Sequence, residues 1–259
     1  MEENLEFPDL LRLIDERSTA FRAVVAAAPG LDAQVPTCPG WTLSDLVKHL
    51  GGGDRFWAAI VGAGPADGPP AEAVAARAAL ELPQEREALL AWLAESTQLL
   101  LNALREAGPE GGCWTWWSAL QSPRTSGGVA RHRVQETAVH TYDAQLAGGA
   151  PQPLPVELAL DGVEEFLFTV CATTSAWPHK PTAFDFHAAE GPSWRLTVDG
   201  DGARTTRTTG EDPDAAGAAV HGTAGELVLY LYDRIQAESL HVDGDAGLLD
   251  LLRAWEPEG

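Results

Sequence analysis

Apolar residues recur every three or four positions along four segments in the first half of the chain, a spacing that is typical of amphipathic helices. We expect these helices at residues 8–28, 42–61, 83–107 and 125–146. Segments rich in glycine and proline separate them, and such residues end helices. Four long helices in a stretch of this length predict an all-α four-helix bundle, in which functional side chains project inward from different helices.

In the second half the apolar period changes to two, which is typical of β-strands. Strands are predicted at residues 182–188, 193–198, 203–208, 218–221 and 240–242, and helices at residues 156–173, 224–235 and 246–255. The turn sequence Asp199-Gly200-Asp201-Gly202 predicts a hairpin between two of these strands. Glycine and proline dominate residues 148–155 and mark a boundary. We therefore expect a helical domain at residues 1–150 and an α+β domain at residues 151–259.

Composition and charge narrow the class of protein. The chain has 259 residues, of which 45% are hydrophobic, and its net charge is −21. This composition is sufficient for globular cores, whereas the negative charge disfavours binding to nucleic acid or to an anionic membrane. No apolar run approaches the length that spans a bilayer. We therefore expect small-molecule partners. The sequence does not decide between a monomer and a homodimer.

The cysteines and the N-terminus indicate the compartment. Cys38, Cys113 and Cys171 are the 3 cysteines, and they are widely spaced, so they form no even-numbered disulfide framework. Residues 1–4 are acidic, and no apolar segment of a secretory signal follows them. We therefore expect a cytoplasmic protein.

The fourth predicted helix carries an unusual stripe of ionisable residues beside its apolar face. The stripe consists of His132, Arg133, Glu136, His140 and Asp143. Ionisable groups next to a core are costly unless they meet partners or a metal. Glu136 and His140 stand one turn apart, which suits two ligands of one ion. The same spacing is also that of an ordinary solvated pair, which stabilises a helix only slightly.

A further candidate ligand lies on the second predicted helix, where His49 falls in the middle of the apolar face. A lone inward histidine is more often a core residue that is hydrogen-bonded nearby. A bundle can nevertheless bring His49 to Glu136 and His140 as two imidazoles and one carboxylate, a set that suits zinc and other divalent transition metals. Asp143 then either orients a ligating histidine from behind or is an exposed surface acid.

Other notable residues have either two possible roles or an ordinary structural role. Gly51-Gly52-Gly53 lies within a helix and lacks the residues of a phosphate loop, so we expect it to permit close helix packing. The aromatic segment 113–117 is either a plug at the end of the bundle or one wall of a substrate pocket. His187, His221 and His241 fall on predicted strands without metal-like spacing, and we expect them to be ordinary residues.

Several motifs together resemble one known family. They are Pro39-Gly40-Trp41-Thr42, Asp45-Leu46-Val47-x-His49-Leu50, Trp57, Glu136-Thr137-Ala138-Val139-His140-x-Tyr142-Asp143, Phe186-His187-Ala188, Trp194-Arg195-Leu196-Thr197-Val198 and Leu229-Tyr230-Leu231-Tyr232-Asp233-Arg234. In these residues the chain resembles the mycothiol-dependent maleylpyruvate isomerase family of actinobacteria. The resemblance implies a DinB-like four-helix bundle followed by a small sterol-carrier-like α+β domain, and it covers nearly the whole chain.

The resemblance also implies a chemistry. It implies that His49, Glu136 and His140 hold a divalent ion, usually zinc, and that the cofactor is the thiol mycothiol. A metal lowers the pKa of a thiol that binds to it, and the activated sulfur would attack a small electrophile, as in an S-transferase or an isomerase. Arg234 stands at the position of an arginine that is frequent in the second domain, and we expect it to receive a substrate carboxylate or a developing enolate. Its alternative role is that of a cation at a helix end.

The remaining expectations concern residues that contact the cofactor and a residue that transfers a proton. We expect Trp57, Trp116 and Trp117 to contact the cofactor. Many family members have an arginine about one turn before the glutamate, whereas the local order here is Arg131-His132-Arg133. His132 is therefore a candidate acid/base group or an additional ligand. Isomerisation, conjugation and thiol exchange are all compatible with these residues.

Two alternatives from other classes remain. One is a non-catalytic, metal-containing binding protein whose sterol-carrier-like half holds an apolar small molecule. The other is a structural two-domain protein in which Glu136 and His140 form only an ion pair.

Overall fold

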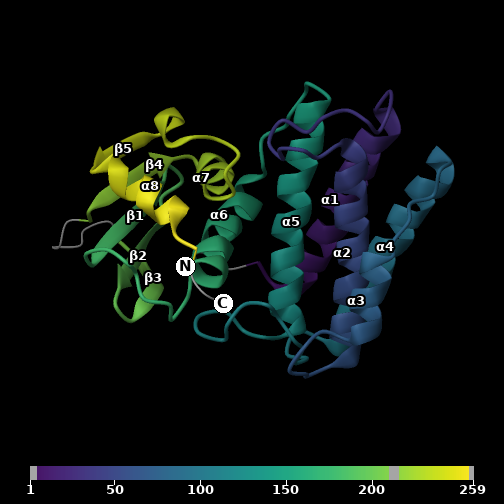
Figure 1. Ribbon diagram of the computed structural model, residues 1–259, viewed down its shortest axis with the longest axis horizontal. Helices are drawn as coiled ribbons and strands as arrows, with labels where there is room; N and C mark the ends of the chain where they lie inside the picture. Colours follow the sequence, from purple (N-terminus) through teal and green to yellow (C-terminus); the bar gives the residue numbers. More distant parts are fainter. Residues whose placement is uncertain (1–4, 210–215, 257–259) are drawn as a thin grey trace. The chain divides into compact units, whose positions relative to one another are not determined.

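The computed structural model describes residues 5–209 and 216–256 (Figure 1). The acidic residues 1–4, on which the expectation about a secretory signal rests, lie outside the described residues. The chain divides into two compact units: Met1–Trp116 with Pro123–Pro153, and Trp117–Ser122 with Leu154–Gly259. The sequence did not predict that the short segment Trp117–Ser122 belongs to the second unit.

The first unit is a bundle of long helices with one short helix beside them. They are α1 (Phe7–Ala27), α2 (Leu43–Ala63), α3 (Ala71–Ala78), α4 (Arg86–Ala107) and α5 (Ser126–Ala147). Both α1 and α2 pack against α4 and α5, so α1 and α2 occupy diagonal positions in the cross-section of the bundle. The contact between α2 and α5 is the one on which the site below depends.

Local sequence explains where α2 begins. Thr42 and Asp45 form the predicted capping box, in which the Thr42 side chain accepts from the Asp45 N–H and the Asp45 side chain accepts from the Thr42 N–H. From this start, Leu46 and Leu50 face a core cluster that also contains Phe21, Leu89 and others from α1 and α4. Helical spacing therefore fixes which side of α2 is buried.

The middle of the bundle differs from the sequence analysis at two places. The sequence assigned no element to residues 71–82, whereas α3 occupies Ala71–Ala78. The helix predicted from residue 83 begins only at Arg86, with Glu85 as its N-cap. Pro83 therefore precedes this helix and does not form its first turn.

The glycines of α2 yield a stability prediction. A methyl group at Gly51 would overlap the ring of Trp92, whereas one at the exposed Gly62 would meet nothing within 4 Å. We expect Gly51→Ala to lower the free energy of unfolding by about 1–3 kcal/mol because it overpacks the helix contact. Gly62→Ala, the matched control, should raise it by about 0.5 kcal/mol. Urea denaturation of both variants measures these changes, and equal effects would contradict the packing argument.

The second unit is α+β, as predicted. Its elements are α6 (Val156–Glu165), η1 (Phe166–Val170), β1 (Thr182–Ala188), β2 (Ser193–Asp199), β3 (Gly202–Thr208), β4 (Ala218–Gly222), α7 (Ala224–Leu231), η2 (Ala237–Ser239), β5 (His241–Gly244) and α8 (Ala246–Ala254). Within the described residues the sheet has five strands in the order β3-β2-β1-β4-β5. The predicted hairpin joins β2 and β3, with Asp199 opposite Gly202.

The two faces of this sheet differ because side chains alternate along each strand. Phe184 and Phe186 of β1, Leu196 of β2 and Val220 of β4 are fully buried on one face. The opposite face carries polar residues, among them Asp185 of β1, whose carboxylate accepts two hydrogen bonds from Arg195. The strand registers thus separate an apolar side from a polar side.

Two helix ends in this unit differ from the prediction. The helix predicted at residues 156–173 is α-helical only to Glu165, and Phe166–Val170 form a π-helix. The helix predicted at residues 224–235 ends at Leu231, because Asp233 has a positive φ of 62° that breaks the helical path. Across the part of the chain that is described, no helix is long and apolar enough to cross a bilayer.

The predicted fold class, an all-α bundle followed by an α+β domain, is confirmed by these elements.

Candidate metal centre

Helices α2 and α5 bring together the three side chains that the sequence suggested as ligands. His49 comes from α2, and Glu136 and His140 come from α5. His49 Nε2 lies 3.1 Å from Glu136 Oε2, and His140 Nε2 lies 3.9 Å from the same oxygen. One potential ligand atom from each residue lies within 4.8 Å of the others. A single ion can therefore be reached by all three.

Asp143 holds His140 from behind. Its Oδ2 lies 2.8 Å from His140 Nδ1, and its Oδ1 accepts a hydrogen bond of 2.6 Å from Thr37. The carboxylate is fully buried, so of the two roles considered for Asp143 the exposed surface acid is excluded. An ionised carboxylate only accepts, so the imidazole proton sits on Nδ1 and the lone pair of Nε2 faces Glu136.

The charges around this cluster suit a cation. Burial lowers the pKa of His49, although its hydrogen bond to Glu136 acts in the opposite direction, so the imidazole is neutral near pH 7. Burial alone would raise the pKa of Glu136. The hydrogen bond with His49 and the nearby His132, His140 and Arg133 outweigh it and hold that pKa well below its usual range. The neutral His49 imidazole, the His140 imidazole and the Glu136 carboxylate are thus available as ligands.

This donor set fits a divalent transition metal. Two imidazole nitrogens and one carboxylate oxygen are a common ligand combination for zinc and related ions, and three protein ligands leave a position open. The side chains of His49, Glu136 and His140 are 27%, 20% and 10% exposed, so an ion can enter from solvent.

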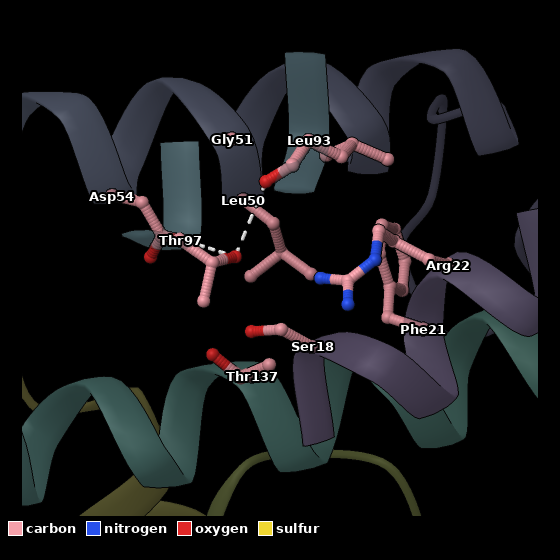
Figure 2. Close-up of a pocket in the computed structure, with 9 residues that line it drawn as sticks. All are labelled: Ser18, Phe21, Arg22, Leu50, Gly51, Asp54, Leu93, Thr97 and Thr137. Atoms are coloured by element: carbon pink, nitrogen blue, oxygen red, sulfur yellow. Dashed lines mark hydrogen bonds between the residues drawn. The ribbon is translucent and has the colours of Figure 1, made fainter. Parts of the chain in front are cut away.

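A buried ion pair supports Glu136 from the same helix. Arg133 Nη2 donates to Asp54 Oδ1 over 2.8 Å, and Arg133 Nη1 lies 3.6 Å from Glu136 Oε2. Thr97 of α4 donates to the other oxygen of Asp54 (Figure 2). Gly53 makes room for the guanidinium, because a Cβ there would lie 3.1 Å from Arg133 Nη1. Arg133 therefore connects the candidate ligand Glu136 to α2 through Asp54, and Asp54 in turn connects to α4 through Thr97.

The sequence did not assign a role to Trp41, which forms one wall of the cluster. Its ring centroid lies 5.1 Å from that of His49 and 6.1 Å from that of His140. The loop before α2 positions it, since the Val35 N–H donates to the Trp41 carbonyl and Gly40 adopts a positive φ of 81°. The signal available in the sequence was the Pro-Gly-Trp-Thr turn directly before the helix cap.

His132 lies next to tryptophans and outside the three-residue ligand cluster. Its ring centroid is 6.0 Å from that of Trp57 and 5.6 Å from that of Trp116. Trp57 in turn stacks against Trp114, with 6.2 Å between centroids. The aromatic segment therefore meets α2 and α5 at His132, whereas Trp117 is grouped with the second unit.

Arg234 lies in the turn that follows α7. Its Nη1 donates to the Tyr232 carbonyl over 2.5 Å, just beyond the end of the helix at Leu231. Both roles that the sequence offered for Arg234, a substrate-binding cation and a cation at a helix end, stay predictions.

Two hollows of the first unit differ in size. The one in Figure 2, between α1, α2, α4 and α5, has a volume of about 10 Å³, enough for one water molecule and too small for a substrate. The other has a volume of about 490 Å³ and is lined by residues of α2, α3 and α4 that include Phe56, Arg77 and Trp92. That volume is in the range of small-molecule pockets.

Two of the three cysteines are poor nucleophiles. All three are free of disulfides. Burial raises the pKa of Cys113 to about 11, with Arg124 partly offsetting it, and burial together with Glu165 raises the pKa of Cys171 to about 12. Both side chains are therefore protonated at neutral pH and unreactive.

The contact between Asp143 and His140 leads to a prediction about metal affinity. Asp143→Asn removes the charge that holds the Nδ1 proton, so we expect zinc affinity to fall by about 10–100-fold. Thr37→Val deletes only the hydroxyl that donates to Asp143 and should have a smaller effect. Competition with a chromophoric chelator measures both affinities. Unchanged zinc affinity in Asp143→Asn would contradict the role given to this carboxylate.

Comparisons with known proteins show the family and the fold of the chain. Residues 11–145 match the model of the mycothiol maleylpyruvate isomerase N-terminal domain, and residues 157–251 match the C-terminal domain of the same family. A crystal structure of the mycothiol-dependent maleylpyruvate isomerase superposes with a TM-score of 0.59 at 16% identity, covering 93% of this chain and 95% of that one. A histidine-to-alanine mutant of that enzyme gives a TM-score of 0.60 at 15% identity, with the same coverage. No curated protein matches the chain significantly.

Proposed function

Because the chain belongs to the mycothiol maleylpyruvate isomerase family, we propose that it is a metal-dependent enzyme that uses the thiol of mycothiol to attack a small electrophile. The observation that carries this proposal is the convergence of His49, Glu136 and His140 within 4.8 Å. These residues would hold the ion, most favourably zinc. A thiol that enters the open position of such an ion loses its proton near neutral pH.

The residues of the chain would divide the remaining work. Asp143 keeps the Nδ1 proton on His140, so that Nε2 stays available as a ligand. Arg133 lies 3.6 Å from the Glu136 carboxylate and helps to keep it ionised. Trp41 covers one side of the two imidazoles. The ligand set is thus oriented and charged before any cofactor binds.

We assign the other predicted residues as follows. His132, on the face of α5 that carries Glu136, would hold or deliver a proton at an imidazole nitrogen. Trp57, Trp116 and Trp117 would contact the cofactor, and Arg234 would receive the anionic group of the substrate. With Cys113 and Cys171 protonated at neutral pH, these two protein thiols would not compete with the external one. Free thiols also fit a reducing cytoplasm.

Two outcomes of the attack are compatible with this site. In an isomerase, mycothiol would supply a thiolate for addition to a conjugated double bond; the resulting single bond would rotate, and cleavage of the carbon–sulfur bond would restore both the double bond and the thiolate. In an S-transferase, it would supply the same thiolate for displacement of a leaving group, which departs with its electron pair, or for addition followed by protonation of the neighbouring carbon. The crystallised relatives are named for the isomerisation of maleylpyruvate, and that substrate is the first to test.

The deciding experiment is a turnover screen of the full chain with mycothiol and a set of electrophiles, read by mass spectrometry. Maleylpyruvate and other activated alkenes would report isomerisation, and alkyl halides and epoxides would report S-transfer. We expect turnover with at least one of them, lost after treatment with a chelator and restored by zinc. Product formation that persists unchanged in the metal-free protein would refute the proposal. Zinc binding without thiol-dependent turnover would instead favour a non-catalytic binding protein.

A further inference from the structure

Three histidines form a row across the polar face of the second unit's sheet. The parallel register of β1 and β4 pairs His187 with His221, and the antiparallel register of β4 and β5 pairs His221 with His241. Their ring centroids are 4.6 Å apart for the first pair and 5.3 Å for the second. These residues are far apart along the sequence, and the sequence analysis therefore expected ordinary roles for them. The strand registers make them neighbours.

Asp243 completes the row on β5. It follows His241 by two positions, so its side chain lies on the same face of the sheet. Its Oδ2 lies 3.1 Å from His221 Nε2, and its Oδ1 lies 3.3 Å from His241 Nε2. One donor atom each from His221, His241 and Asp243 lies within 4.8 Å of the others. This spacing is as tight as that of the cluster in the helical bundle.

Hydrogen bonding within the described residues does not account for this convergence. The Nε2 atom of His221 is buried and makes no hydrogen bond, although the Asp243 carboxylate is only 3.1 Å away. The two groups therefore approach each other at an angle that does not suit a direct hydrogen bond. A buried nitrogen without a partner is costly, and an ion between the imidazole and the carboxylate would satisfy it.

His187 supports the row from the other side. Its ring stacks on His221 with an interplanar angle of 18°, and its Nδ1 lies 2.9 Å from Ser193 Oγ. The stacked ring of His187 and its contact with Ser193 fix the orientation of the His221 imidazole. His187 is therefore a positioning residue for His221.

We propose that His221, His241 and Asp243 form a second site for a divalent transition metal ion such as zinc, in the α+β unit and made of residues that the bundle site does not use. Two imidazole nitrogens and one carboxylate oxygen supply three ligands and leave a position for water or another ligand. The side chains of His241 and Asp243 are 71% and 64% exposed, so the ion exchanges with solvent. It would also cross-link the edge strand β5 to β4.

Equilibrium dialysis of the metal-free full chain against zinc, followed by elemental analysis, tests this proposal. We expect about two equivalents in the unchanged protein and about one in His241→Ala. The His49→Ala protein should keep about one equivalent, and the double variant should bind none. His179→Ala is the matched control, because His179 is an exposed histidine of the same unit outside the cluster, and it should bind as much zinc as the unchanged chain.

The two sites fail in distinguishable ways. A single equivalent that His49→Ala abolishes and His241→Ala leaves intact would overturn the second site and keep the proposed function. A single equivalent that His241→Ala abolishes and His49→Ala leaves intact would support the second site and overturn the bundle site. Cobalt provides a second readout, since its visible absorption in the His49→Ala protein should disappear when His241→Gln is added. Circular dichroism checks that each variant is folded.

Discussion

Replacing His49 with alanine is expected to remove the catalytic metal and the thiol-dependent turnover together. The variant leaves only two of the three side chains of this cluster, Glu136 and His140, and two side chains hold a divalent ion far less tightly than three. We expect kcat/KM with mycothiol to fall by more than about 100-fold, beyond the loss that is typical of residues behind the ligands. Elemental analysis and a turnover assay on the same preparation measure both effects.

The pattern across variants distinguishes loss of the metal from loss of the fold. Glu136→Gln keeps the shape of the side chain but removes the charge, so it should lose metal and turnover as His49→Ala does. His179→Ala removes an exposed imidazole elsewhere and should change neither. Turnover at the original rate in a His49→Ala protein without metal in the bundle would show that the three converging side chains do not carry the reaction.

Removing one member of the buried pair Arg133–Asp54 is expected to cause the largest loss of stability. Their side chains are only 2% and 5% exposed, and the pair spans 2.8 Å. Asp54→Ala leaves the buried guanidinium without its nearest carboxylate and beside the more distant Glu136 carboxylate. The expected loss is about 3–5 kcal/mol in the free energy of unfolding. Chemical denaturation followed by circular dichroism measures it.

A double variant shows whether the loss comes from the unpaired charge. Replacing both partners with apolar residues, Asp54→Leu with Arg133→Met, should be less destabilising than Asp54→Ala alone, because no buried charge remains. Glu16→Ala is the control, since Glu16 pairs with Arg12 on the exposed side of α1, and it should leave the denaturation midpoint nearly unchanged. If the double variant is less stable than Asp54→Ala, the loss of stability comes from altered packing and not from the unpaired charge.

Much of the fold follows from local patterns. The apolar period of 3.6 located the long helices of the bundle, and the capping box at Thr42 fixed the start of α2, because both depend on residues within one or two turns. The period of two located the strands of the sheet in the same way. The short helix α3 and the end of α7 were missed, because α3 is short and consists mostly of alanine, with Val74 as its one larger apolar residue, and the positive φ of Asp233 is not encoded by a glycine.

In the candidate site, too, local spacing predicted some features and packing between distant elements decided others. The sequence by itself determined that His49 faces inward on one helix and that Glu136 and His140 share a face of another, since helical spacing decides both. Only the tertiary structure decided that these two faces meet, that Thr37 lies against Asp143 and that Arg133 pairs with Asp54. Strand register likewise decided that His221 and His241 are neighbours. The physical reason is that periodicity shows which side of an element is buried, whereas packing between elements distant in the chain selects what that side contacts.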